Sequence, residues 1–302
     1  MRKTDESQDL FNNDLNLEGI YLFFKESLNR IIISAVVFSI IGIVYSLSLE
    51  DKYTSVAKVL PGSLDESRAL GGLSAISGLT GVNLSGNGIK VLIAKETINS
   101  KKFLNSFLER EMNSQHIIAT KKWDKEKREI VFDFEIYDPV EEKWIYRNKV
   151  DSELGPTRGE LREAFLSSFS AEEDEDTQVF ELTFTHLSPY LAKQILDSYI
   201  SALNESVKED DLRDSQERYD YLKTKFSETN IVAIQQNIST LMSEELKILS
   251  TLRNKDYAFK VIDPPDLPEK KSGPFRSLIC ITFGLFGIFF GVILSLFKRY
   301  FS

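Results

Sequence analysis

The sequence is poor in the residues on which redox, metal and most hydrolytic sites depend. Cys280 is its single cysteine, so no disulfide bond can form within the chain, and His116 and His186 are its two histidines. The histidines stand far apart in no metal-ligand spacing, and we expect surface or core roles for them. No G-x-S-x-G, H-E-x-x-H or paired-cysteine motif occurs. We therefore predict no catalytic residue, no metal site and no cofactor, although the many carboxylates leave a glycosidase-like pair open.

Basic charge is also in short supply, because 37 lysines and arginines face 46 aspartates and glutamates, for a net charge of −9. This balance argues against a nucleic-acid partner, which favours a basic surface. One glycine spacing is typical of phosphate loops, but Asn87 and Gly88 replace the Lys-Ser/Thr pair that would hold phosphate and magnesium. We interpret residues 70–88, which mix Gly and Ser with apolar residues, as a flexible loop that lines an assembly interface.

Two long apolar runs near the ends of the chain contrast with the polar region between them. Residues 31–49 and 277–297 carry no charge, and as helices each would be about 30 Å long, the thickness of a bilayer's hydrocarbon core. The first run exceeds the apolar stretch of a signal peptide, so a retained anchor is favoured over a cleaved leader. We predict two membrane spans with both tails on one side. Basic residues flank the runs almost evenly and do not decide the orientation.

The spans divide the chain into five predicted parts. The soluble domain covers residues 50–276, with an α/β base at 50–187 and 254–268 and long helices at 188–253. The other parts are an N-terminal tail at residues 1–30, the spans at 31–49 and 277–297, and a C-terminal tail at 298–302.

Small residues recur along one face of each predicted span. They are spaced three or four apart, which keeps them on one side of a helix and lets two backbones approach closely in lipid. We interpret both stripes as helix-packing faces, within one chain or between chains. They comprise Ala35, Ser39, Gly42 and Ser46 in the first span and Gly284, Gly287, Gly291 and Ser295 in the second.

The soluble part mixes strand and helix patterns, which predicts an α+β fold. Thr157 and Glu160 form a capping box at the start of a helix over residues 157–169. Helical spacing predicts another helix at 91–110. Five consecutive acids at 172–176 lack calcium-ligand spacing and predict a solvated turn. Period-two patterns predict strands at residues 53–60, 130–137, 144–146, 178–186 and 257–262.

The most regular soluble segment begins at Ser188, which is expected to cap a helix whose first turn contains Pro189. Helical periodicity then continues without glycine or proline for some 60 residues. Since the chain must return to the second span, one straight helix is excluded. We predict a long antiparallel helical hairpin that reverses near residues 227–231, where Ser, Thr and Asn cluster.

Both ends of the chain resemble the Wzz family of polysaccharide co-polymerases, also called chain-length determinant proteins. In residues 15–60, a short amphipathic lead and Lys/Arg residues precede the first span, and a Tyr-x-Ser strand follows it. In residues 261–300, a proline-rich segment runs into a glycine-bearing span. Pro268 and Pro274 match the first and third prolines of that segment, whereas Lys271 replaces the middle one. The prolines singled out are Pro264, Pro265, Pro268 and Pro274.

The resemblance implies a bacterial inner-membrane protein whose bulk is periplasmic and which forms ring-shaped homo-oligomers. Such proteins set the modal length of lipid-linked surface glycans such as O-antigen, together with a Wzy-type polymerase, and are not enzymes. Undecaprenyl-linked glycan is an implied further partner. Relatives that make exopolysaccharide often carry a kinase domain after the second span, and the short tail here is expected to lack it.

Three other classes of protein are alternative hypotheses for two membrane spans around one soluble domain. A sensory ectodomain needs an output module, which a five-residue tail cannot hold. An inner-membrane adaptor of an export pump would also carry a long helical hairpin, but usually has one anchor. A hydrolase acting on the glycan would shorten polymer without a polymerase present.

Overall fold

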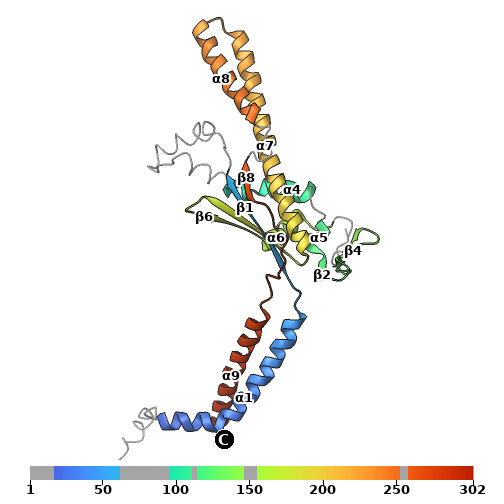
Figure 1. Ribbon diagram of the computed structural model, residues 1–302, viewed down its shortest axis with the longest axis vertical. Helices are drawn as coiled ribbons and strands as arrows, with labels where there is room; N and C mark the ends of the chain where they lie inside the picture. The colour runs from blue at the N-terminus through green and yellow to red at the C-terminus, as the bar shows by residue number, and fades with distance from the viewer. Residues whose placement is uncertain (1–16, 62–94, 111–113, 146–154, 252–257, 302) are drawn as a thin grey trace, which may run out of the picture. The chain divides into compact units, whose positions relative to one another are not determined.

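The computed structural model describes residues 17–61, 95–110, 114–145, 155–251 and 258–301 (Figure 1). The loop predicted at residues 70–88 lies outside these ranges. The chain divides into two compact units, which we call the helix-pair unit (residues 1–51 and 272–302) and the central unit (residues 52–271).

The helix-pair unit consists of α1 (Leu17–Ser48) and α9 (Arg276–Phe301), which pack against each other. Within them, Ser27–Ser48 and Arg276–Lys298 are long and apolar enough to cross a membrane. Helix α1 therefore begins before the apolar run that the sequence singles out.

The central unit is built on a four-stranded antiparallel sheet with the order β6-β7-β1-β8. Strand β1 lies in the middle, where Tyr53 pairs with His186 at one end and Val59 with Phe180 toward the other. The strands predicted at 53–60, 178–186 and 257–262 are confirmed with small shifts of their ends. Their bounds are β1 Tyr53–Pro61, β6 Phe169–Asp174, β7 Val179–His186 and β8 Phe259–Asp263.

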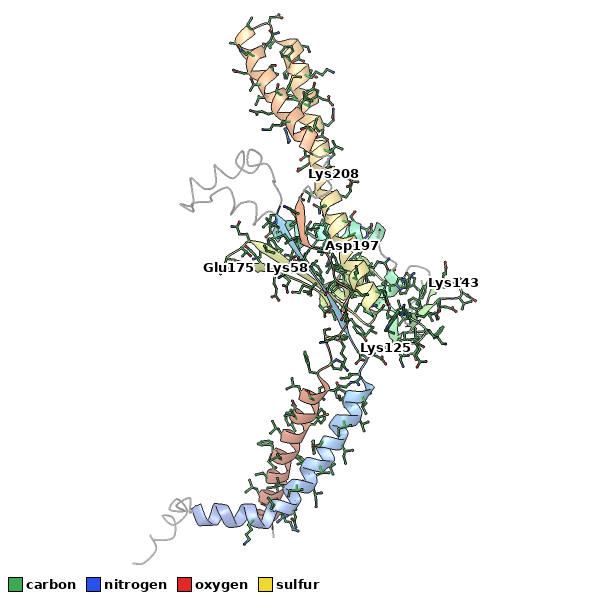
Figure 2. All side chains as sticks on the ribbon, in the orientation of Figure 1. Lys58, Lys125, Lys143, Glu175, Asp197 and Lys208 are labelled. Atoms are coloured by element: carbon green, nitrogen blue, oxygen red, sulfur yellow. The ribbon has the colours of Figure 1, made fainter. Side chains whose placement is uncertain are left out.

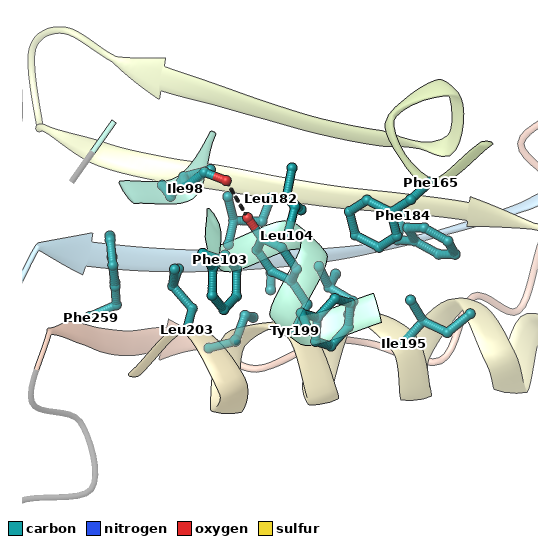
Figure 3. Close-up of a cluster of buried hydrophobic side chains, with 14 of the residues drawn as sticks. Ile98, Phe103, Leu104, Phe165, Leu182, Phe184, Ile195, Tyr199, Leu203 and Phe259 are labelled. Atoms are coloured by element: carbon teal, nitrogen blue, oxygen red, sulfur yellow. Dashed lines mark hydrogen bonds between the residues drawn. The ribbon is translucent and has the colours of Figure 1, made fainter. Parts of the chain in front are cut away.

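Helices α4 (Lys101–Arg110), α6 (Arg158–Ser168) and α7 (Pro189–Glu228) supply side chains to the core next to this sheet (Figure 3). Tyr199 of α7 is fully buried at the centre of an aromatic cluster, and its hydroxyl donates to the Ile98 carbonyl at 2.7 Å. The predicted capping box is confirmed, because Thr157 Oγ1 accepts from the Glu160 N–H while the Glu160 carboxylate accepts from the Thr157 N–H. The central unit thus folds around one apolar core.

A smaller layer of short elements follows α4. It contains α5 (Ser114–Ile118), the hairpin β2 (Thr120–Asp124) and β3 (Glu129–Phe132), and the two-residue strands β4 (Tyr137–Asp138) and β5 (Lys143–Trp144). The single strand predicted at 130–137 is wrong. The Asp133 carboxylate accepts from the Glu135 N–H at 3.1 Å and its carbonyl accepts from the Tyr137 N–H, which folds the chain into a turn between β3 and β4.

Two further predictions need correction. The acids at 172–176 do not form one turn, because β6 continues to Asp174 and the turn follows it. The helix predicted at 91–110 is interrupted at Ser100, whose hydroxyl accepts from the Phe103 N–H at the start of α4. The part of that helix before residue 95 and residue 146 of the short strand lie outside the described residues.

Helix α7 starts at the predicted cap, where Ser188 Oγ accepts from the Leu191 N–H, and runs for 40 residues. It ends at Glu228, and α8 (Val232–Thr251) returns along it. The predicted helical hairpin and its reversal near residues 227–231 are confirmed, and with them the α+β fold class.

Candidate functional site

The small residues of the two apolar helices lie in the contact between α1 and α9. Gly287 approaches α1 most closely: a methyl group there would lie 2.7 Å from Ala35 Cα and 2.9 Å from the Ser34 carbonyl oxygen. A methyl group on Gly291 would lie 2.8 Å from Ile31 Cα. These distances are too short for any side chain, so the two backbones meet because both positions are glycine.

The rest of the stripe follows the same contact. Gly284 lies opposite Ser39, and Gly42 lies opposite the Phe283 ring. Ser46 and Ser295 are both buried, at 2% and 1% exposure. Sequence reasoning missed the contributions of Ile31, Phe38 and Phe283, which are too large for the small-residue pattern. It also missed Ser34, which is small but lies one position off the stripe.

Residue numbers fall along α1 as they rise along α9, so the two helices are antiparallel. Gly42 meets Phe283, and Ile31 meets Gly291. At the end where α1 finishes and α9 begins, Asp51 Oδ1 accepts from Arg276 Nη2 at 3.1 Å. The chain therefore enters and leaves the helix pair at one end, with both tails at the other.

The proline-rich segment continues the sheet past β8 on the edge of β1. The Val56 N–H donates to the Asp266 carboxylate at 2.8 Å, and Ser55 Oγ donates to the Asp266 carbonyl at 2.7 Å. Asp266 stands between Pro265, which is buried, and Pro268, which is partly exposed; Pro264 is exposed. Prolines lack an N–H to donate, so Asp266 supplies the pairing that they cannot. Pro274 belongs to the helix-pair unit, two residues before α9.

The outer part of the hairpin, α7 from Glu205 onward together with α8, includes a polar contact between the two helices. Arg218 of α7 binds Glu245 of α8 through two hydrogen bonds of 2.7 and 3.3 Å, which raise the pKa of the Arg218 guanidinium. Many apolar side chains of this part remain exposed. They are Leu212, Tyr221 and Phe226 on α7, Ile231 at the reversal, and Val232, Ile234, Leu241 and Leu246 on α8.

Three acidic residues, Glu96, Asp210 and Asp211, line a cleft of about 430 Å³ beside α4 and α7. Asp210 binds Lys102 at 3.1 Å and Arg213 at 2.7 Å. Burial alone would raise the pKa of the Asp210 carboxyl, but these two hydrogen bonds outweigh it and lower the pKa. A carboxylate held ionised in this way is unsuited to act as a general acid.

The two histidines meet at the start of α7, although the sequence gives no sign of it. His186 Nδ1 accepts from the Ser188 N–H at 3.0 Å, so Nε2 carries the proton and donates to the His116 carbonyl at 2.9 Å. His186 is buried, which confirms a core role for it, and burial lowers the pKa of both imidazoles. No group of three or more potential metal ligands occurs among the residues that the structure describes.

Comparison with known proteins gives a family match for one segment of the chain. Residues 13–111 match the family described as Wzz, chain length determinant protein. The resemblance to this family is therefore confirmed for the segment that contains α1, β1 and α4. The chain has no match among curated protein sequences.

Three solved structures are similar to the chain at low sequence identity. A full-length bacterial polysaccharide co-polymerase aligns over 93% of this chain and 96% of its own, with 12% identity and a TM-score of 0.41. A fragment of the co-polymerase WzzB from Salmonella Typhimurium aligns over 74% and 100%, with 13% identity and a TM-score of 0.34. A mutant of the O-antigen chain-length regulator WzzBSF from Shigella flexneri aligns over 74% and 100%, with 12% identity and a TM-score of 0.22.

Proposed function

We propose, on the premise that residues 13–111 are a Wzz chain length determinant domain, that this protein regulates the modal length of a lipid-linked surface polysaccharide such as lipopolysaccharide O-antigen. It acts as a co-polymerase beside a Wzy-type polymerase, whose undecaprenyl-linked glycan it meets. The family match is the observation that carries this proposal.

In this proposal α1 and α9 cross the bacterial inner membrane, and the central unit lies in the periplasm. The five-part organisation predicted from the sequence is retained, with spans at 31–49 and 277–297. Support comes from the length and apolar composition of both helices and from their antiparallel contact, which gives the two tails one common side.

The small-residue stripe holds the two spans together, and Gly287→Ala tests this role. The added methyl meets the backbone of α1, so the helices must separate, at a cost of about 1–3 kcal/mol for overpacking. Disulfide formation between Asp51→Cys and Arg276→Cys in a Cys280→Ser background reports the pairing, and we expect it to slow. Gly284→Ala is the matched control, because its methyl meets only the Ser39 hydroxyl at 3.3 Å. Equal rates in both variants would refute the packing role.

The protein is proposed to form ring-shaped homo-oligomers through its central unit. The eight exposed apolar side chains in the outer part of the hairpin support this, because association would remove them from water. Ile234→Ser with Leu241→Ser should lower the oligomer mass measured for the detergent-solubilised protein. Lys223→Ser with Lys247→Ser, also exposed on this hairpin, should leave the mass unchanged.

We further propose that the protein is a regulator without enzymatic activity. Asp210 in the α4–α7 cleft supports this, because Lys102 and Arg213 keep its carboxylate ionised and it therefore carries no proton to donate. Purified protein that shortened glycan in the absence of a polymerase would contradict the proposal.

Deletion of the gene, followed by gel electrophoresis of the surface glycan, tests the function directly. We expect synthesis to continue while the modal band cluster disappears, and the cluster to return on complementation. An unchanged ladder, or complete loss of polymer, would reject length regulation.

A further inference from the structure

One end of the central sheet collects aromatic and basic side chains that the proposed function leaves unused. Strand β1 starts at this end with Tyr53. Lys125, which Figure 2 labels, belongs to the β2–β3 turn, and its Nζ lies 5.8 Å from the Tyr53 ring centroid. On the same hairpin, Trp123 of β2 places its ring 5.7 Å from the ring of Tyr190 on α7. We call Trp123, Tyr190, Lys122, Lys125 and Lys127 the basal patch.

The basal patch is accessible to solvent and held in place by local structure. Tyr190 is 43% exposed, the three lysines are exposed, and Trp123 is half-buried. Asp124 shapes the turn by accepting from the Lys127 and Glu126 N–H groups at 3.1 and 3.0 Å. The Lys127 and Glu126 hydrogen bonds lower the pKa of the Asp124 carboxyl, and the charges of Lys127 and Lys122 act in the same direction.

The charge of this hairpin opposes that of the whole protein. Residues 120–132 carry five basic and three acidic side chains, a net charge of +2, in a chain of net charge −9. Of these, Lys121 pairs with Asp133 at 3.5 Å. An anionic surface would therefore be attracted to the hairpin and repelled by most of the remaining chain.

The covalent chain limits how far this end of the sheet can lie from α1. Residues 49–52 alone separate Ser48, the last residue of α1, from Tyr53, the first residue of β1. Five Cα–Cα steps of extended chain reach at most about 18 Å. If α1 spans a bilayer up to Ser48, the Tyr53 Cα must lie within that distance of the membrane boundary, and Lys125 Nζ lies 5.8 Å from the centroid of the Tyr53 ring.

The chemistry of the basal patch suits such a boundary. Trp and Tyr are enriched at membrane interfaces, where an apolar ring and a polar edge are both accommodated. Lysines near anionic headgroups strengthen binding to the membrane surface. A glycan would also stack on exposed aromatic rings, but a neutral glycan gives no use to the lysines.

We propose that the basal patch is a membrane-surface contact, in which Trp123 and Tyr190 enter the headgroup layer while Lys122, Lys125 and Lys127 bind anionic phospholipid headgroups. The contact would fix the tilt of the central unit on the bilayer. This inference rests on the part of the proposed function that places α1 across the membrane.

The two tryptophans of the chain allow a direct test on the full-length protein. In Trp144→Phe, Trp123 is the sole tryptophan, and its fluorescence is measured in nanodiscs that contain a headgroup spin-labelled lipid. We expect strong quenching when the nanodisc contains phosphatidylglycerol and weaker quenching in pure phosphatidylcholine. Absence of quenching in both would overturn the proposal. Since Trp144 packs near Gly155, a dye on Lys127→Cys in Cys280→Ser repeats the test with both tryptophans intact.

Charge reversal separates headgroup binding from simple proximity. Lys122→Glu with Lys127→Glu should reduce Trp123 quenching in phosphatidylglycerol to the level in phosphatidylcholine, whereas Lys223→Glu with Lys247→Glu on the helical hairpin should not. Equal quenching in both variants would overturn the role of the lysines. Quenching that soluble glycan abolishes in phosphatidylcholine would point to a glycan site instead.

The outcomes also separate this inference from the proposed function. A chain that fails to enter nanodiscs refutes the membrane spans themselves. A chain that enters them without quenching at Trp123 refutes the lipid contact alone, and the glycan ladder of the gene deletion is unaffected by either result.

Discussion

In the first half of α7 six apolar residues are buried, whereas from Glu205 onward Ser215 is the one buried residue of this fully described helix. The first group, Ala192, Ile195, Leu196, Tyr199, Ile200 and Leu203, packs into the core of the central unit. The second half exposes Leu212, Tyr221 and Phe226. One continuous helix thus has two environments. Its first half is buried in the core, whereas its outer half, from Glu205 onward, contacts α8 and exposes many of its side chains.

The sequence of α7 accounts for this difference. In its first half, apolar residues recur every three or four positions, so they form a stripe along one face of the helix that packs against the sheet. Between Lys208 and Arg218 that stripe is replaced by charged residues, several of which pair along the helix, such as Arg213 with Asp210 at 2.7 Å. The outer half is therefore helical through local pairs and its contact with α8.

The comparison of the two halves of α7 predicts the largest loss of stability at Tyr199 and almost none at Tyr221. Tyr199→Ala should lower the free energy of unfolding by about 3–5 kcal/mol, because it opens a cavity in the core and leaves the Ile98 carbonyl without its donor. Tyr221→Ala, at a side chain 63% exposed, should change it by less than about 0.5 kcal/mol. Denaturant titration of the full-length protein in detergent measures both. Similar losses in the two variants would remove the distinction between the halves.

Asn204 lies where the buried first half of α7 meets the exposed outer half, and its substitution tests this boundary. Its buried side chain accepts from the Ala258 and Phe259 N–H groups at 2.9 and 2.8 Å and donates to the Phe259 carbonyl at 3.0 Å, which fixes the start of β8 against α7. Asn204→Ala leaves these groups unpaired, and we expect a loss of about 1–3 kcal/mol. Asn237→Ala, at an exposed position of α8, is the matched control and should be near neutral in the same titration.

Much of this fold could be predicted because periodicity and caps are local signals. The strand at 53–60, the capping box of Thr157 and Glu160, and the start of α7 at Pro189 all depend on neighbouring residues. The division of α7 into buried and exposed halves was partly visible as the loss of its apolar stripe. The reversal could be predicted because the chain must return to the second apolar run, and the cluster of Ser, Thr and Asn placed it near residues 227–231.

Predictions failed where a side chain competes with the backbone or where contacts are distant. Asp133 turns the chain inside an alternating pattern that otherwise reads as one strand. Asn204 is a polar residue among apolar ones, and its three partners come 54 and 55 residues later. The His116–His186 contact spans 70 residues and leaves no local pattern. In the helix pair, the small-residue stripes indicated the contacting faces but not the larger residues opposite them.

The start of α7 makes its inner half sensitive to acid. Burial lowers the pKa of His186 and of His116 below the value near 6.5 expected in the unfolded chain. The unfolded state therefore binds more protons as the pH falls, so stability is complete above about pH 6.5 and decreases below it. Protonation would also remove the acceptor that His186 Nδ1 offers to the Ser188 N–H.

We expect the free energy of unfolding to fall between pH 7 and pH 5, by at most about 1.4 kcal/mol per pH unit for each histidine. Denaturant titrations at several pH values measure the slope. His186→Gln with His116→Gln should flatten it, whereas an equal slope in this variant would assign the acid sensitivity to other groups. Hydrogen exchange should show that α5 and the first turn of α7 loosen before α8 does.

The smallest effect is expected in the outer half, at Arg218. Its guanidinium is 41% exposed, and Glu245 opposite is 14% exposed, so Arg218→Met should cost only about 0.2–1 kcal/mol in global stability. The local effect should be larger, because the Arg218–Glu245 pair joins α7 to α8, and amide exchange along α8 should accelerate in the detergent-solubilised protein. Arg213→Met is the control, since Arg213 pairs with Asp210 and Asp214 on its own helix. Unchanged exchange along α8 in Arg218→Met would contradict a role of this pair in joining the two helices.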